Sequence, residues 1–233
     1  MDRMMIKNIG FVAFAAVVIA VTGYLACGEE IQGTARVALL AVGPTLAIGI
    51  VGAYLLHREE LLIPLVTFRP GDFTRGFMAA LVIFGVAFSA THFFMPLTSK
   101  RASWLLRVYL QIGDPKDLKE HVPGVVVAIA LGAVADELVF RGVVPRLLEG
   151  VLGSRRAWVY SAVLFAAVQL PTAFALRTDP AGWNPLLPAA ALGAGLVWGY
   201  MTRRWGRLWP AIISHALVDW CVIVMFRLYG PSV

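Results

Sequence analysis

Long apolar runs alternate with short polar segments along this chain, and the alternation predicts membrane-spanning helices. A helix needs roughly 20 apolar residues to cross a bilayer. Apolar runs of about that length cover residues 9–26, 35–56, 77–97, 124–146, 157–176, 186–201 and 208–229. The pattern therefore predicts an all-α fold, a polytopic transmembrane helix bundle with about seven spans.

The longest polar stretch lies between residues 98 and 121, and apolar side chains recur within it at helical spacing. These residues are Trp104, Leu105, Val108, Tyr109 and Ile112. Such a pattern is typical of an amphipathic helix lying in the membrane interface, here at residues 103–112. An ordinary linker with one packed face explains the spacing equally well, and both interpretations stay open.

The first apolar run follows a short basic start, as a secretory signal does. Tyr24 is a poor residue beside a cleavage site, and the run is long enough to span a membrane. We therefore expect residues 1–26 to stay as an anchor rather than to be cleaved. The two cysteines, Cys27 and Cys221, lie far apart in or beside apolar segments, so a disulfide framework is not indicated.

Composition supports the membrane interpretation. Hydrophobic residues make up 59% of the chain and charged residues 15%, with a mean hydropathy of +0.77; soluble domains carry about 25% charged residues. The formal charge is +6, but the basic residues form short clusters between apolar runs, so we expect contacts with membrane lipids and no nucleic-acid partner. Their bias predicts a cytoplasmic N-terminus, and the short loops are typical of a bacterial inner membrane. Composition predicts no oligomeric state.

Several polar side chains interrupt the apolar runs, and an intramembrane ionisable group is a functional-site hypothesis by default. Counted from the helix ends at 1.5 Å per residue, they lie at similar depths in one leaflet: Glu137 at about 14 Å, His215 at about 9 Å, Asp219 at about 15 Å and Gln169 at about 18 Å. Glu137 with Arg141, and His215 with Asp219, are four residues apart, so each pair shares a helix face. Their convergence predicts a catalytic or transport cavity.

Each of these residues also has a purely structural explanation. Glu137 and Arg141 are an ordinary i, i+4 ion pair, and Asp219 is in a position to hold His215 in one tautomer. Gln169 is an amide of the kind that commonly bridges membrane helices. We interpret His92 and His121 as bystanders, because one lies toward the opposite end of its span and the other in a loop.

Three motifs resemble a known family. The stretches 136–142 (DELVFRG), 165–169 (FAAVQ) and 214–219 (SHALVD) occur in the order and approximate spacing of the EExxxR, FxxxH and HxxxN/D motifs of the CAAX prenyl protease and bacteriocin-processing (CPBP) family. The resemblance covers about residues 124–225. It implies an intramembrane endopeptidase unit at residues 122–233, preceded at residues 1–121 by N-terminal anchoring helices and a connector.

The resemblance implies a role for each matching residue. Asp136 stands where the family has the glutamate that activates water, and Glu137 and Arg141 match the second acid and the arginine that orient the site or bind substrate. His215 and Asp219 match the third motif, which stabilises the oxyanion or positions water. The implied reaction cleaves a peptide bond near a substrate C-terminus or in a signal segment of a peptide or membrane-protein substrate.

Two residues depart from the family pattern. Asp136 is one methylene shorter than glutamate, and a misplacement of about 1 Å can lower a rate about a hundredfold, so Glu137 is an alternative base. Gln169 replaces the histidine of the second motif; its amide can donate to an oxyanion but is a poor metal ligand. No cofactor is therefore expected. Zinc is disfavoured because only His215, with Glu137, offers ligands at this depth and a catalytic zinc uses about three.

Two other functions remain open on the sequence. A catalytically impaired relative would keep the cavity as a membrane-embedded scaffold that binds a peptide or a lipid tail. A small proton or ion carrier would use the same acids and histidine as a relay, although few polar residues continue a path to the other face.

Overall fold

The computed structural model describes residues 3–96 and 98–226, which fold as helices joined by short loops. The described ranges contain no β-strand, only an isolated bridge between Thr178 and Gly182. The helices are α1 (Arg3–Leu25), η1 (Glu29–Ile31), α2 (Ala35–Arg58), α3 (Leu62–Val66), α4 (Asp72–Phe94), α5 (Ala102–Ile112), α6 (Pro115–Glu120), α7 (Val122–Glu137), η2 (Leu138–Val143), α8 (Val144–Leu152), α9 (Ser154–Ala167), α10 (Leu170–Ala175), α11 (Leu186–Trp205), α12 (Trp209–Trp220) and η3 (Cys221–Phe226).

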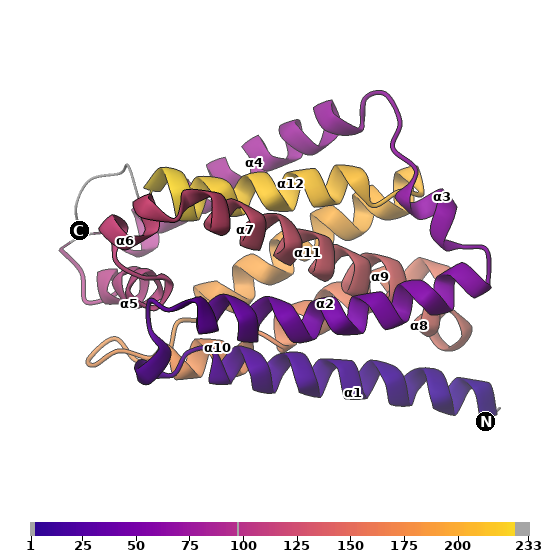
Figure 1. The fold of residues 1–233 in the computed structure, drawn as a ribbon, viewed down its shortest axis with the longest axis horizontal. Helices are drawn as coiled ribbons and strands as arrows, with labels where there is room; N and C mark the ends of the chain where they lie inside the picture. The colour runs from indigo at the N-terminus through magenta and orange to yellow at the C-terminus, as the bar shows by residue number, and fades with distance from the viewer. Residues whose placement is uncertain (1–2, 97, 227–233) are drawn as a thin grey trace.

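The long helices lie side by side along the length of the molecule (Figure 1). The start of α1, α3 and α8 lie at one end of this bundle, and α5 and α6 lie at the other. Helix α2 packs on α7, and α4 packs on α12, so helices from both predicted units contribute to one bundle. The all-α prediction is confirmed, and the division at residue 121 stays a prediction.

Within the described residues, five helical segments are long and apolar enough to cross a membrane: 5–25, 35–58, 72–94, 122–152 and 154–175. The predicted count of seven is not confirmed. Helix α11 carries small residues and closing arginines, which make it less apolar, and the apolar helix Trp209–Val224 is shorter than the five. Residue 97 of the predicted third span and residues 227–229 of the seventh lie outside the described residues.

Many large apolar side chains are exposed on the outside of the bundle, whereas a few charged groups are buried inside it. Phe14, Leu39 and Phe93 are 63%, 68% and 76% exposed, whereas Glu137 is fully buried. Exposed apolar surface of this extent normally marks contact with another molecule or a membrane. The arrangement is the one expected if lipid, rather than water, surrounds the helices.

Close packing between α2 and η2 depends on a glycine. A Cβ atom at Gly52 would overlap the Val143 side chain, whereas the space beside Gly43 on the same helix is open. Overpacking of this kind typically lowers stability by about 1–3 kcal/mol.

We therefore expect Gly52→Ala to lower the thermal unfolding temperature in detergent, while Gly43→Ala should leave it unchanged or raise it through better helix propensity. The double variant Gly52→Ala/Val143→Ala should recover part of the loss, because the shorter side chain at 143 makes room. An equal response of the two glycine variants would contradict this packing.

The predicted amphipathic segment is the helix α5, and its packed face is visible. Trp104 and Gln111 are buried; Trp104 Nε1 donates to the Gly182 carbonyl at 3.1 Å and Gln111 Nε2 to the Ala26 carbonyl at 2.8 Å. The helix thus joins two loops at its end of the bundle, and its place in the membrane interface stays a prediction.

Next to α5, the thiol of Cys27 is free, and burial raises the pKa of this thiol to about 11.

At the other end, a buried ion pair ties the start of α4 to the loop before α12. Asp72 is fully buried and accepts hydrogen bonds from Arg207 Nη2 at 2.7 Å and from Arg207 Nε at 3.0 Å. The Arg69 backbone N–H donates to the same carboxylate at 2.9 Å. This junction connects the segment after α3 to α12, the helix that carries His215. The carboxylate of Asp72 raises the pKa of the Arg207 guanidinium above its ordinary value.

Candidate active site

The first acidic motif lies where an α-helix changes to a wider turn. Helix α7 ends at Glu137, η2 is a π-helix, and α8 continues in the same direction. Pro145 has no N–H to donate to the Arg141 carbonyl, and its ring crowds that carbonyl, so regular α-helical pairing fails there. The Ser161 hydroxyl donates to the carbonyl of Phe140 within η2. Such π-bulges are frequent at functional sites.

Glu137 lies at the centre of a buried polar cluster. Its Oε1 atom lies 2.9 Å from His215 Nδ1 and 3.2 Å from Arg141 Nη1. Glu137 is fully buried, and Arg141 and His215 are only 4% and 6% exposed. Glu137 Oε2 has no hydrogen-bond partner in the described part of the chain. Oε1 therefore lies beside both an imidazole and a guanidinium, whereas Oε2 remains available to accept a hydrogen bond.

Aromatic rings pack against the two basic side chains of this cluster, Arg141 and His215. The Trp198 ring stacks on the imidazole of His215 with centroids 4.0 Å apart and planes inclined by 17°, and Trp198 Nε1 donates to Ser214 Oγ at 3.0 Å. The Arg141 guanidinium lies 4.4 Å from the centroid of the Phe165 ring. Aromatic faces attract cations, most strongly when both are desolvated. Trp198 had no distinguishing signal in the sequence, since it lies in an apolar run.

The remaining candidate residues surround this cluster at greater distance. Asp219 Oδ2 lies 3.6 Å from His215 Nε2, so the imidazole has a carboxylate on each side. Asp136 is half-buried and interacts electrostatically with His215, Glu137 and Arg141, but its side chain makes no hydrogen bond or ion pair with any described residue. The structure thus brings Glu137, Arg141 and His215 into contact, with Asp219 and Asp136 beside them.

Gln169 is not part of this contact network. It is half-buried at the turn between α9 and α10, and its side chain makes no hydrogen bond within residues 3–96 and 98–226. It lies one helical turn after Phe165, which is in contact with both Arg141 and His215. Its predicted role in the site stays a prediction.

Two glycines of α11 allow α9 and the site to approach closely. A Cβ atom at Gly195 would lie 3.1 Å from Arg141 Nη2, and one at Gly199 would lie 3.1 Å from Trp158 Cε3. Small residues four apart commonly allow such approaches between membrane helices. This spacing is visible in the sequence and could have identified the face of α11 that meets the site.

The carboxylates and the imidazole of the cluster could in principle bind a metal ion, and their placement decides whether they do. No group of three or more His, Cys, Asp or Glu side chains placed to hold a metal ion is found among the described residues. The chemistry that this arrangement can support with its own side chains is proton transfer by a carboxylate, next to an imidazole and a guanidinium that can stabilise negative charge.

The comparisons with known proteins agree with the motifs. Residues 119–221 match the family model of the type II CAAX prenyl endopeptidase Rce1-like family. The matched range runs from just before α7 to just after α12, and it includes all six candidate residues: Asp136, Glu137, Arg141, Gln169, His215 and Asp219. No curated protein and no solved structure matches the chain significantly. The family and the apolar helices together support an integral membrane protein. This match over residues 119–221 therefore supports membership of the CAAX prenyl protease and bacteriocin-processing family, the family that the three motifs resemble.

Proposed function

We propose that this protein is an intramembrane peptidase of the CPBP type that hydrolyses a peptide bond with water activated by a carboxylate. The observation that carries the proposal is the buried contact of Glu137 Oε1 with both His215 and Arg141, at 2.9 and 3.2 Å. Acid–base hydrolysis requires a group that accepts a proton and groups that stabilise negative charge. The buried cluster supplies both, with two acids, an imidazole and a guanidinium. The match to a protease family supports the same reaction class.

In this proposal the two neighbouring acids have different tasks. Glu137 holds His215 and orients Arg141, since one of its oxygens contacts both side chains. Asp136 makes no side-chain hydrogen bond with any described residue, so its carboxylate is free to accept the proton of the attacking water. As this water attacks the peptide carbonyl, the proton moves to Asp136 and then to the leaving amine.

The developing oxyanion needs donors that are already in place. His215 lies between Glu137 and Asp219, and Trp198 fixes the plane of its ring. We propose that an N–H of His215, together with the amide of Gln169, donates to the oxyanion. Preorganised donors of this kind are worth about a hundredfold or more in rate.

We predict that Asp136→Asn lowers the rate of peptide cleavage by about a hundredfold or more, because a positioned general base contributes that much. The thermal unfolding temperature should change little, since Asp136 holds no described side chain in place. Both quantities can be measured on the purified protein in detergent. A slow rate together with a large loss of stability would instead assign Asp136 a structural role.

The function itself is tested by incubating the purified protein with a library of membrane-protein tail and signal-segment peptides and analysing the products by mass spectrometry. Cleavage at defined bonds supports a peptidase. Binding of peptides without cleavage supports the scaffold, and Asp136→Glu/Gln169→His should then create activity, whereas an active native enzyme should gain little.

The setting that we propose is a bacterial inner membrane with the N-terminus in the cytoplasm, and the partners are membrane lipids and a peptide or membrane-protein substrate. On this topology the N-terminal end of the bundle in Figure 1, with α3 and α8, faces the cytoplasm. Labelling of single cysteines introduced at either end of the bundle in intact cells measures the orientation.

A further inference from the structure

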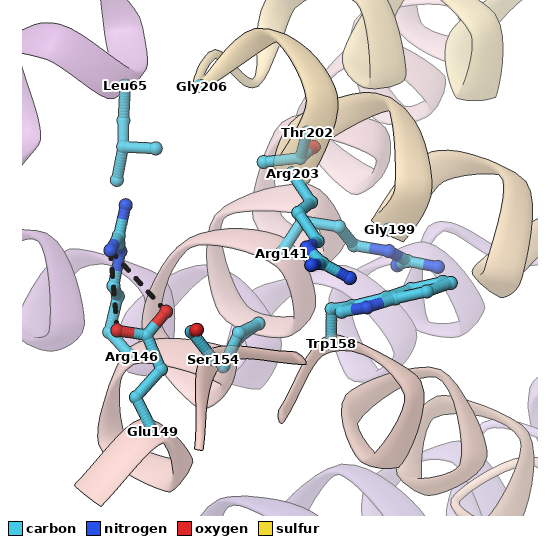
Figure 2. Close-up of a pocket in the computed structure, with 11 residues that line it drawn as sticks. Leu65, Arg141, Arg146, Glu149, Ser154, Trp158, Gly199, Thr202, Arg203 and Gly206 are labelled. Carbon is cyan, nitrogen blue, oxygen red and sulfur yellow. Dashed lines mark hydrogen bonds and ion pairs between the residues drawn. The ribbon is translucent and has the colours of Figure 1, made fainter. Parts of the chain in front are cut away.

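A small cavity opens beside the cluster, at the end of the bundle that holds α8. Its volume is about 160 Å³, and its walls come from α3, η2, α8, α9 and α11. Figure 2 shows Arg141, Arg203, Thr202 and Trp158 on one side of it, opposite the Arg146–Glu149 ion pair. The cavity therefore combines arginines from three helical segments, and its lining includes a single acid.

The polar atoms on the inner wall lack partners. Arg141 Nη2, Trp158 Nε1 and Thr202 Oγ1 are buried without a hydrogen-bond partner in the part of the chain that the structure describes, while Arg141 Nη1 forms the ion pair with Glu137. All three partnerless atoms can donate a hydrogen bond. Buried donors are normally satisfied, so several unsatisfied ones around one cavity indicate a ligand with oxygen acceptors.

The charges point to the same kind of ligand. Glu149, the acid in the lining, lies 3.5 Å from Arg146, so these two charges offset each other. The guanidinium of Arg203 has no acid in the lining to offset it, and the cavity is therefore positively charged. Arg203 is exposed and lies 6.0 Å from the centroid of the Trp158 ring. Guanidinium groups bind phosphate well because their planar fork presents two N–H groups together. The N–H and O–H groups of Arg141, Arg203, Trp158 and Thr202 also outnumber the hydrogen bonds that the two oxygens of a carboxylate can accept.

We propose that this cavity binds a phosphate group, presented either by the head of an anionic phospholipid or by a free phosphate compound. Basic pockets between membrane helices bind anionic lipid heads in this way. A cavity of about 160 Å³ has room for a phosphate group. Arg141 also contacts Glu137 at 3.2 Å, so an occupied cavity shares a guanidinium with the candidate active site.

Binding of inorganic phosphate to the full chain in detergent, measured by isothermal titration calorimetry, tests the proposal without any turnover. We expect Arg203→Gln to weaken binding about tenfold or more, since a hydrogen bond to a charged group is lost, and Arg203→Lys to recover part of it. Arg204→Gln is the matched control, because Arg204 is exposed on the same helix but does not line the cavity. Equal losses in the two glutamine variants, or acetate binding as tightly as phosphate, would overturn the proposal.

The lipid source is measured on protein in nanodiscs that contain phosphatidylglycerol or phosphatidylcholine. Retention of phosphatidylglycerol in native mass spectra, lost on Arg203→Gln but not on Arg204→Gln, assigns the cavity to a lipid head. Binding of inorganic phosphate without lipid retention assigns it to a free phosphate compound. Absence of both kinds of binding in a folded protein rejects the site.

Discussion

Glu137→Gln is expected to lower the rate of peptide cleavage by about a hundredfold or more, because Glu137 holds in place the imidazole and the guanidinium that stabilise negative charge during the reaction. Glutamine has nearly the shape of glutamate, but it carries no charge to pair with Arg141 and His215, which lie 3.2 and 2.9 Å from Oε1. The rate loss should appear mainly in kcat, because the charge acts during the reaction. Steady-state cleavage of a peptide that the native protein cuts provides the measurement.

Glu120→Gln is the control for this substitution, since Glu120 is exposed on α6 and contacts no candidate residue. It should leave both kcat and KM unchanged. A thermal unfolding scan of Glu137→Gln shows how much of the rate loss reflects lost folding. If the variant stays folded and cleaves at the native rate, Glu137 has no part in the reaction.

Asp72→Ala should cause the largest loss of stability among the substitutions considered. Removing the carboxylate leaves the guanidinium of Arg207 buried and unpaired, and breaking a buried pair in this way typically lowers stability by about 3–5 kcal/mol. The Arg69 backbone N–H would also lose its acceptor, which is 2.9 Å away. We expect a large fall in the thermal unfolding temperature in detergent.

Two variants show whether the buried charge is the cause. Asp72→Ala/Arg207→Ala should be more stable than Asp72→Ala alone, because no unpaired guanidinium remains. Asp114→Ala removes an exposed helix-capping aspartate whose carboxylate accepts the Lys116 N–H at 2.7 Å, and should lower stability by only about 1 kcal/mol. Similar losses for Asp72→Ala and Asp114→Ala would contradict a special role for the buried pair.

The helical fold could be predicted from the sequence because apolar runs of membrane length leave few other structures. The number of spans could not be predicted from the sequence. Polar residues bound α11 and α12 as they bound the other helices, but α11 is less apolar and α12 is shorter than the five long apolar segments. The break between α9 and α10 also follows from local chemistry, because Pro171 cannot donate a backbone hydrogen bond within the run. Hydropathy alone treats residues 157–176 as one continuous helix.

The centre of the candidate site was predictable because helical spacing places Glu137 with Arg141 and His215 with Asp219 on shared faces. Spacing does not say which faces of different helices meet. The stacking of Trp198 on His215 depends on the close approach of α11, and the π-helix η2 depends on packing around Pro145. Depth along a helix suggested that Gln169 joins the cluster, but its side chain makes no hydrogen bond with the described residues.

The central claim, that water activated beside Glu137 cleaves a peptide bond, is tested most directly by a single-turnover reaction in water enriched in ¹⁸O. Mass spectrometry of the fragment that gains a new C-terminus measures the incorporated oxygen. The native protein should yield a fragment carrying ¹⁸O in its new carboxylate, and Glu137→Gln should yield almost none of it. An unlabelled fragment, or a labelled fragment formed by Glu137→Gln at the native rate, would rule out cleavage by water activated beside Glu137.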